Sequence, residues 1–341
     1  MLFVFVALLL VAVPLVSACA PTGPTTGPIT LKYHSSEQKG VGSIEPTVWW
    51  CEQVEQRSGG RIKFDYVYGG ALGTLADQPV NIKGGVFDCG MLTCIYNPGL
   101  YPAATVNTLP FVTGNLKAIT SASMDLEQDP AIQAEYQKLN MKNMFVYLSD
   151  PMEIMSHVSA KNLAELKPLK IRAHGGAAEA FDAAGLTGVA IPWPDLPSAA
   201  ERHVVDAACI PVPGTAADLN FHEIFKYSIR IPVFYFHYSM PINLDTWNKL
   251  PADIQKLMLD VGKEANQQSL KIIDRIGAES WKKFDAAGVV QIQWSADELK
   301  KFKDLGGPPV WDKWVKDVTA QGVPGKQVLD TFQKLLAKYG G

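Results

Sequence analysis

A long run of helical periodicity between Pro251 and Phe284 limits how this chain can fold more than any other feature of its sequence. Apolar residues recur there at intervals of three and four, which places them on one face of a helix. A continuous helix of about 34 residues would be roughly 50 Å long, well beyond the width of a small domain. We therefore expect it to cross two lobes; two shorter helices that break near Gln267–Ser269 are the alternative.

Shorter helix and strand patterns alternate along the rest of the chain. Ile62, Phe64 and Tyr66 alternate with polar residues, as in a half-buried strand. Further strands are predicted at Leu31–Tyr33, Val86–Leu92, Met144–Leu148, Leu169–Arg172 and Val189–Pro192. Helices are predicted at Thr47–Ser58, Asp77–Gly84, Asn162–Lys167 and Gly176–Ala184. This alternation indicates an α/β protein, and a length of 341 residues favours two lobes.

The amino-terminal segment predicts export. Leu2–Val16 is an almost unbroken apolar run, shorter than the ~20 residues of a membrane-spanning helix and typical of a signal peptide, which we assign to residues 1–18. Val16–Cys19 resembles a bacterial lipobox, in which the cysteine is lipidated; an ordinary cleavage site is the alternative. Residues 19–29, rich in Pro, Gly and Thr, predict an extended tether after the lipidated Cys19. We therefore expect a lipid-anchored protein on the periplasmic or cell-surface side of a membrane.

Four cysteines follow Cys19, namely Cys51, Cys89, Cys94 and Cys209. An oxidising compartment and an even number permit two disulfides, in any of three pairings. Four buried free thiols are an equally open alternative, because a chain of this length can build its core without disulfides. The spacing between Cys89 and Cys94 does not match a zinc knuckle.

Composition and motifs argue against several function classes. The net charge is −3 and no long basic cluster occurs, so neither nucleic acid nor an anionic membrane surface is expected as a partner. The sequence has no Gly-x-Ser-x-Gly, no His-Glu-x-x-His and no phosphate-binding glycine loop with its lysine. The 6 histidines are scattered singly. We therefore expect no catalytic centre, no metal and no cofactor.

Ordered motifs from Thr30 to the carboxyl terminus resemble the DctP family of TRAP (tripartite ATP-independent periplasmic) solute-binding proteins. The central region reads Leu-Lys-Pro-Leu-Lys-Ile-Arg up to Arg172, then an apolar helix, then Val-Ala-Ile-Pro-Trp-Pro-Asp and Arg-His-Val-Val-Asp-Ala-Ala-Cys-Ile-Pro. Segments that agree in the same order are Ser58–Ile62, Gly70–Gly73, Gly84–Asp88, Leu109–Phe111 and Trp247–Pro251.

This resemblance implies a two-lobed periplasmic-binding-protein-like α/β fold with a long helix spanning both lobes. Lobe I would comprise residues 30–152 and 236–275, and lobe II residues 153–235 and 276–341. The implied function is an extracytoplasmic receptor that binds a small organic acid by closure of its lobes and delivers it to TRAP membrane permease subunits. A receptor that presents the ligand to a signalling protein, or a secreted enzyme acting on a carboxylate, are the alternatives.

The resemblance also names candidate ligand-binding residues. Arg172 matches the arginine that binds the ligand carboxylate in the family, and a guanidinium fork suits the two oxygens of a carboxylate; a surface arginine paired with Glu165 is the alternative. Trp193 matches an aromatic residue of the family's pocket, where it could pack on the carbon skeleton of the ligand; a role in the interlobe core is the alternative. Further candidates, each weighed against a packing role, are Thr93, Cys94, Tyr96, His34 in the loop that ends at Ser43, and Phe236.

Two departures from the family pattern bear on specificity. Met155 stands where many relatives have a second arginine, counted back from Lys161, and Ile210 stands where relatives have an asparagine before the proline. One cationic group and one amide are thus replaced by apolar side chains. We therefore expect a monocarboxylate with an apolar or aromatic body rather than a dicarboxylate.

Overall fold

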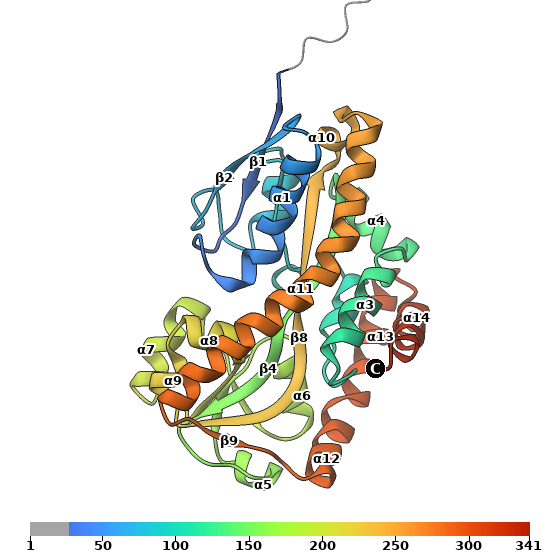
Figure 1. Cartoon of the computed structure of the whole chain (residues 1–341). Helices are drawn as coiled ribbons and strands as arrows, with labels where there is room; N and C mark the ends of the chain where they lie inside the picture. Colours follow the sequence, from blue (N-terminus) through green and yellow to red (C-terminus); the bar gives the residue numbers. More distant parts are fainter. Residues whose placement is uncertain (1–26) are drawn as a thin grey trace, which may run out of the picture.

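Two long antiparallel strands, β4 (Met141–Ser156) and β8 (Tyr227–Asn243), form the axis of the molecule. In the computed structural model, which describes residues 27–341, they pair from Met141 opposite Asn243 to Ser156 opposite Tyr227. Shorter strands continue the sheet on both sides in the order β2-β1-β3-β8-β4-β7-β5-β6, and β9 pairs with β8. The long strands therefore connect the upper and lower parts of the molecule in Figure 1.

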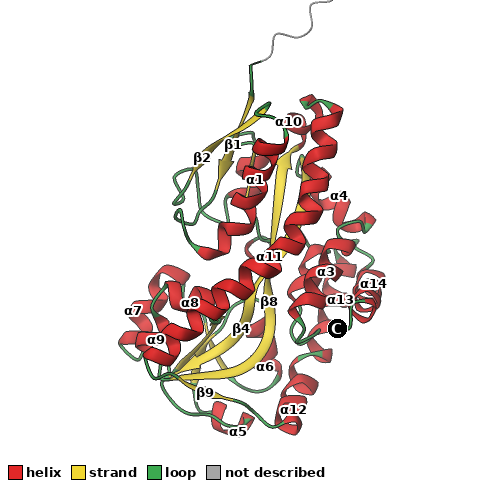
Figure 2. Ribbon diagram, in the orientation of Figure 1, coloured by secondary structure: helices red, strands yellow, loops and turns green. Residues whose placement is uncertain are grey.

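The upper part is built on parallel pairing of β1 with β2 and β3. Its elements are β1 (Ile29–His34), α1 (Glu45–Arg57), β2 (Ile62–Val67), α2 (Gln78–Lys83), β3 (Cys89–Gly90) and α10 (Leu244–Lys249). Figure 2 shows α1 alongside β1 and β2, on the side of these strands that faces the centre of the molecule. Two 3-10 turns, η1 (Gly42–Ile44) and η2 (Cys94–Tyr96), follow β1 and β3 at the side that faces the lower part.

The lower part repeats this arrangement with parallel pairing of β5 with β6 and β7. Its elements are α5 (Leu163–Leu166), β5 (Lys170–Arg172), α6 (Gly176–Ala183), β6 (Thr187–Val189), η4 (Trp193–Asp195), α7 (Leu196–Glu201), β7 (Ala207–Pro211), α8 (Gly214–Asp218), α9 (Phe221–Ile224) and β9 (Val290–Ile292). The predicted α/β fold with two lobes is thereby confirmed.

A third group of helices flanks the long strands. It comprises α3 (Leu116–Leu126), α4 (Pro130–Lys138), α12 (Ala296–Gly306), α13 (Pro308–Ala320) and α14 (Gly325–Lys338). The helix α12 contacts α6 of the lower part, whereas α14 contacts α3. The last helices of the chain thus contact both α6 of the lower part and α3 beside the long strands, and the assignment of residues 276–341 to lobe II stays a prediction.

The long helix α11 (Ala252–Ala286) contains 35 residues and is continuous, so the alternative of two shorter helices is wrong. Pro251 stands at its N-cap, immediately before the first turn. The helix contacts α1, α3, β4 and α8, and it descends across the whole molecule in Figure 1. Trp50 Nε1 donates to Met258 O at 3.1 Å, and Asn266 Nδ2 donates to Val146 O at 2.8 Å. These buried hydrogen bonds fix α11 against α1 and β4.

Most predicted strands and helices agree with the structure. The predicted strand Val189–Pro192 is wrong, because β6 ends at Val189 and residues 190–192 are irregular. Met144–Leu148 is only a segment of β4, because residues 152–156 pair with β7 and β8 as well. Val86–Leu92 yields only the two-residue strand β3. The residues on either side of β3 are linked to β1 and β8 only by isolated hydrogen bonds, among them those of the bridge between Leu92 and Ser239.

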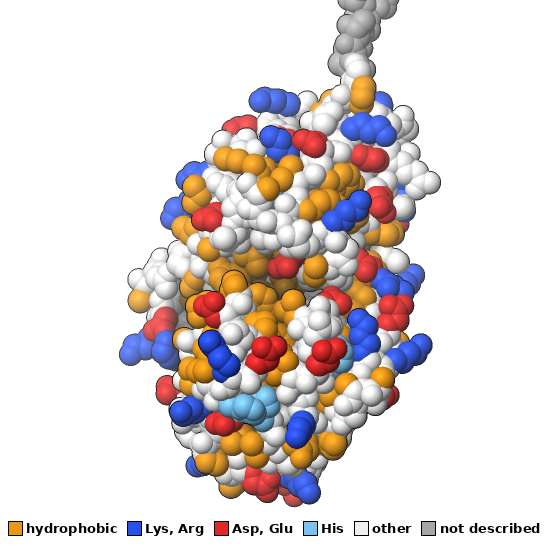
Figure 3. Space-filling model, turned by 90° about the vertical axis from the view of Figure 1, so that its left-hand side faces the viewer, with side chains coloured by type: hydrophobic (Ala, Val, Ile, Leu, Met, Phe, Trp, Pro, Cys, Tyr) orange, Lys and Arg blue, Asp and Glu red, His pale blue; other side chains and the backbone are white. Residues whose placement is uncertain are grey.

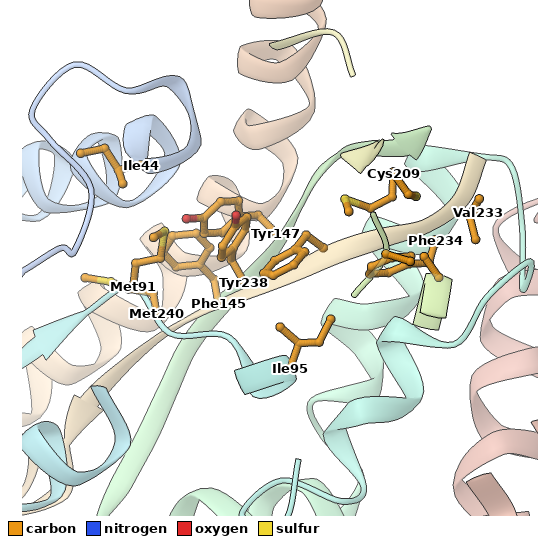
Figure 4. Close-up of a cluster of buried hydrophobic side chains, with 14 of the residues drawn as sticks. Ile44, Met91, Ile95, Phe145, Tyr147, Cys209, Val233, Phe234, Tyr238 and Met240 are labelled. Carbon is orange, nitrogen blue, oxygen red and sulfur yellow. The ribbon is translucent and has the colours of Figure 1, made fainter. Parts of the chain in front are cut away.

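Aromatic side chains fill the core where the long strands pass beneath α11. Figure 4 shows Phe145, Tyr147, Tyr238 and Met240 in this cluster. The rings of Tyr147 and Tyr238 stack with centroids 5.2 Å apart. The Tyr147 hydroxyl donates to Ser43 O at 2.9 Å, which connects the long strands to η1 of the upper part.

All four cysteines of the body, Cys51, Cys89, Cys94 and Cys209, are free and buried, so the alternative of buried thiols is confirmed and that of two disulfides is wrong. Each lies in an apolar cluster, and burial raises the pKa of every one of these thiols. A thiol that is both inaccessible and protonated is unreactive.

The predicted signal peptide, Cys19 and nearly all of the predicted tether lie outside the described residues. Gly27 and Pro28 precede β1, which begins at Ile29. Within residues 27–341, no helix has the length and apolar character that crossing a membrane requires.

Gly262 marks the closest approach between α11 and β4. A Cβ atom at this position would clash with Met144 O, which is backbone and cannot move independently. We predict that Gly262→Ala lowers the free energy of unfolding by about 1–3 kcal/mol through overpacking. Gly277→Ala, in the same helix, is the control: its Cβ would lie 3.8 Å from Pro213, an ordinary contact, so better helix propensity makes it neutral or stabilising by up to about 1 kcal/mol. Urea denaturation measures the free energy of unfolding of both variants. Equal changes in the two would contradict the close packing of α11 against β4 at Gly262.

The thiols give a second prediction. Native protein should react only marginally with Ellman's reagent, because the four thiols of the body are buried. After denaturation without reductant, all four thiols should react with the reagent. A fifth thiol should react only where Cys19 is unmodified. A denatured protein that releases fewer than four thiols unless it is first reduced would show a disulfide and contradict the described core.

Candidate ligand-binding site

A cavity of about 120 Å³ lies between the upper and lower parts of the molecule and opens into an outer space of about 830 Å³. Small-molecule sites span roughly 300–1,000 Å³, a range that the outer space reaches and the inner cavity alone does not. Figure 3 shows the hollow at mid-height with apolar side chains in its floor. Residues that border both the inner and outer spaces are Glu37, Leu75, Tyr96, Arg172, His174 and Trp193.

Arg172 reaches this cavity because it is the last residue of β5. The strand pairs in parallel with β6 and β7, with Arg172 opposite Val189 and Ala208. In α/β sheets, ligands bind outside the carboxyl ends of parallel strands. The guanidinium is held from behind: Nε donates to Ile191 O at 3.3 Å, and Nη1 donates to Cys209 O at 3.4 Å.

The charge of Arg172 has no counterion in the described part of the chain. The side chain is 5% exposed, and no carboxylate of residues 27–341 lies within ion-pair distance of it. Glu165, the partner in the surface alternative, instead accepts from Lys161 N and Asn162 Nδ2, so that alternative is wrong. Burial lowers the pKa of Arg172, yet a guanidinium stays protonated. A buried, unpaired cation at the wall of a cavity favours an anionic ligand.

Aromatic side chains surround this cation. Cζ of Arg172 lies 5.4 Å from the Trp193 ring centroid. The ring of Tyr96 lies 6.1 Å from that of Phe236, which lies 5.4 Å from that of Tyr238. The cavity thus combines one positive group with flat apolar walls, an arrangement suited to the carbon skeleton of an organic acid.

The structure brings four of the sequence-predicted residues together at the cavity, namely Arg172, Trp193, Tyr96 and Phe236. His34 and Thr93 are fully buried behind it instead. The His34 ring accepts from Leu72 N at 3.3 Å and contacts Gln78 Nε2 at 2.9 Å. The Thr93 hydroxyl caps η2. These two side chains shape the upper wall and do not line the cavity.

The other three predicted residues also lie in the core. Cys94 belongs to the apolar cluster beneath the C-terminal helices, and Met155 and Ile210 belong to the cluster under α7, α8 and α9. The residue of β4 that does line the cavity is Met152, whose partner on β7 is Pro211. Over residues 152–156, β4 pairs with β7 in unbroken register, so the side chains alternate and Met155 lies on the opposite face from Met152. Counting back from Lys161 does not tell which of these faces borders the cavity.

Sequence reasoning missed several polar residues of the cavity: Glu37, Ser43, His174, Thr215 and Asp218. His174 lies two residues after Arg172, so strand alternation could have placed it on the same side. Glu37 and Ser43 lie in the loop that the sequence did mark as a wall. Thr215 and Asp218 carried no signal, since their position depends on the short helix α8.

The cavity has a single strong positive group. Within residues 27–341, Arg172 is the one lysine or arginine that lines it, and Glu37 and Asp218 supply negative charge. Burial, and next the charge of Arg172, lower the pKa of His174, so this imidazole is neutral at pH 7. A second carboxylate on a ligand would meet negative charge rather than a cation.

The family model for the DctP proteins, described as bacterial extracellular solute-binding protein, family 7, matches residues 43–317. The chain belongs to this family. Proteins of the DctP family are solute-binding receptors rather than enzymes.

Three similar proteins extend this result. A monocarboxylate 2-oxoacid-binding periplasmic protein of Nostoc sp. is 22% identical over 306 residues, 82% of this chain and 81% of the relative. A TRAP periplasmic solute-binding protein of Desulfovibrio salexigens is 26% identical, with a TM-score of 0.83 over 92% of this chain and 97% of that one. A marine metagenome TRAP protein specific for aromatic acid ligands, in complex with metahydroxyphenylacetate, is 21% identical, with a TM-score of 0.83 over 92% and 100%. The DctP fold therefore extends over nearly the whole chain.

The unpaired charge of Arg172 leads to a prediction about stability. Arg172→Met should raise the free energy of unfolding of ligand-free protein by about 1 kcal/mol, because it removes a buried cation that has no counterion. Arg230→Met is the control with the opposite sign. Arg230 Nε donates to the buried carboxylate of Glu153 at 2.6 Å, so its removal leaves that charge uncompensated and should destabilise by about 2–4 kcal/mol.

The pH dependence of this control follows from Glu153. Burial raises the pKa of its carboxyl to about 7, although Arg230 acts in the opposite direction. At pH 8 the Glu153 carboxylate is ionised, so Arg230→Met should lower the free energy of unfolding by the full amount. At pH 5 this group is protonated, so the same substitution should lower the free energy of unfolding by less. Urea denaturation of dialysed protein at both values checks this. Destabilisation by Arg172→Met equal to that by Arg230→Met would show that Arg172 is a structural residue.

Proposed function

We propose that this protein is the extracytoplasmic receptor of a TRAP transporter, which binds a small monocarboxylate with an apolar or aromatic body and delivers it to membrane permease subunits. The observation that carries the proposal is the buried guanidinium of Arg172, which has no anionic partner among the described residues and faces an aromatic cavity. The family supports it, since its members are solute-binding receptors.

In the proposed binding mode, the carboxylate and the carbon skeleton of the ligand contact different parts of the cavity wall. The carboxylate accepts hydrogen bonds from the outer edge of the Arg172 guanidinium, whose Nη2 has no protein acceptor in the described part of the chain. The carbon skeleton lies against Trp193, Tyr96 and Phe236. The ligands of the Nostoc and marine relatives, monocarboxylate 2-oxoacids and aromatic acids, have this form.

The charges of the cavity favour one carboxylate over two. A dicarboxylate would place its second anionic group near Glu37 or Asp218, with no second lysine or arginine at the lining to neutralise it. Like charges in a poorly solvated site repel strongly. Met152, where the wall of β4 meets the cavity, is apolar and accepts only an uncharged part of the ligand.

Closure of the lobes would complete the site. The pairing of β4 with β8 is interrupted between Leu148 and Pro151, at the level of the cavity. Ser149 Oγ accepts from Phe236 N at 3.1 Å across this interruption. We assign the bending of the two long strands to this point, so that a ligand bridging the lobes shifts the equilibrium toward the closed form.

The position of the protein in the cell is part of the same proposal. The apolar run Leu2–Val16 and the lipobox-like Val16–Cys19 support export and a lipid anchor at Cys19. The Nostoc relative is a periplasmic protein. The Pro/Gly/Thr-rich segment that follows Cys19 would let the body reach a permease in the same membrane.

A thermal-shift screen tests the proposal. Benzoate, phenylacetate and 4-methyl-2-oxopentanoate should each be compared with succinate and malate on protein freed of prebound ligand. A ligand at 100 times its dissociation constant adds about 2.7 kcal/mol to the stability of the folded state, which raises the melting temperature measurably. We expect shifts with monocarboxylates that disappear in Arg172→Gln and persist in Arg202→Gln, an exposed arginine of the same lobe.

Two results would contradict the proposal. Submicromolar binding of succinate or malate, with no binding of monocarboxylates, would refute the assigned ligand class. Melting temperatures that no acid changes, for a protein that carries no prebound ligand, would refute the carboxylate receptor itself.

A further inference from the structure

Glu37 projects into the cavity from the lobe opposite to Arg172. It follows β1, and its backbone is fixed on both sides: Glu37 N donates to Ser35 Oγ at 3.1 Å, and Gly69 N donates to Glu37 O at 2.9 Å. Gly69 adopts a φ of 71°, which glycine reaches without strain. The carboxyl group is thus presented by a well-defined loop rather than by a free surface chain.

The carboxyl group of Glu37 has no partner. Among the described residues, none donates a hydrogen bond to it, and no lysine, arginine or histidine lies within ion-pair distance. Burial raises the pKa of Glu37 above its ordinary value. A half-buried carboxyl that borders a cavity and lacks any donor is an unused acceptor.

Tyr96 shows how the two charges of the cavity are arranged. Burial is the main cause that raises the pKa of its hydroxyl; Arg172 acts against it, and Glu37 adds to it. Tyr96 is therefore within electrostatic reach of both groups. Glu37 also raises the pKa of Tyr238, after the larger effect of burial. The negative group thus faces the same aromatic walls as the positive one.

Asp218, the other acidic residue of the lining, is different. It is exposed to solvent, and its Oδ2 accepts from Gly42 N at 3.4 Å. Water and a backbone amide already satisfy this carboxylate. Glu37 is consequently the acidic group of the cavity whose hydrogen-bonding capacity is left for a ligand.

We propose that Glu37 selects, among carboxylic acids, those that carry a hydroxyl or amine donor at the end remote from the carboxylate. The inference rests on the proposed function, because Arg172 must fix the carboxylate end for the other end to reach the opposite lobe. A ligand with such a donor would bridge the two lobes. Its carboxylate would bind Arg172 of lobe II, and its hydroxyl or amine would bind Glu37 of the opposite lobe.

The selectivity follows from desolvation. An acid without a donor would remove water from Glu37 and leave this acceptor unsatisfied, whereas a hydroxyl or amine replaces the lost water. Sites built to satisfy a polar group of the ligand discriminate strongly against analogues that lack it. A methoxy group, which fills the same space without donating, should be as unfavourable as hydrogen or worse.

Isothermal titration with matched ligands tests the inference on the purified full-length protein. One series compares phenylacetate with its 2-, 3- and 4-hydroxy isomers and with 3-methoxyphenylacetate, and a second compares 2-oxobutanoate with 4-hydroxy-2-oxobutanoate. In wild type we expect at least one hydroxy acid to bind about tenfold tighter than its parent, as for a hydrogen bond to a charged group. The methoxy compound should gain nothing.

The variants separate Glu37 from the rest of the site. In Glu37→Met the preference for the hydroxy acid should disappear while the parent acid binds at least as tightly as in wild type, which also shows that the variant is folded. Glu37→Gln, which keeps an acceptor but no charge, should retain about a twofold preference. Asp65→Asn, at an exposed carboxylate of the same lobe outside the cavity lining, is the control and should keep the full preference of wild type.

The failure of this inference differs from that of the receptor proposal. Equal binding of hydroxy and parent acids in wild type, or a preference that survives Glu37→Met, would overturn the role of Glu37. The receptor proposal would still stand in that case, provided that binding of the acids is lost in the Arg172 variant. If no acid of either series binds, the proposed ligand class is refuted and the inference falls with it.

Discussion

A buried arginine without a counterion is the interaction on which this structure depends. Arg172 is the last residue of β5 and borders the cavity. Its guanidinium donates hydrogen bonds to Ile191 O and Cys209 O, and no described carboxylate neutralises its charge. Desolvation of an unpaired cation is unfavourable for folding. The parallel strands β5, β6 and β7 and the aromatic walls hold it there nonetheless. Such an arrangement is stable only as part of a larger core, and it becomes favourable once an anion enters.

The remainder of the molecule places a second lobe opposite this cation. The strands β4 and β8 and the helix α11 each run from one lobe to the other, so three connections join the lobes. The helix is bound tightly, with Gly262 against Met144 and Asn266 between α3 and β4. The strands are irregular at the level of the cavity. Bending of the strands while the helix holds the lobes in alignment is a simple route to closure about a ligand.

The sequence revealed the features that follow from local periodicity or a short motif. The length of α11 followed from its apolar stripe, and Arg172 followed from the strand motif that it ends. Met155 was not the residue at the cavity, because the side chains of β4 alternate and Met155 lies on the opposite face from Met152, which does line the cavity. Cys94 lies in the core because the distant C-terminal helices cover it. The exposure of Glu37 to the cavity depends on loop hydrogen bonds to Ser35 and Gly69 that no local pattern encodes.

A crystal structure of the protein with its tightest-binding acid is the most direct test of carboxylate binding by Arg172. We expect both carboxylate oxygens to lie within hydrogen-bonding distance of the Arg172 guanidinium, the body of the ligand to contact Trp193 and Phe236, and the lobes to close about it. A ligand whose carboxylate points toward the upper lobe, or that occupies another cavity while Arg172 remains unpaired, would show that Arg172 does not bind the carboxylate.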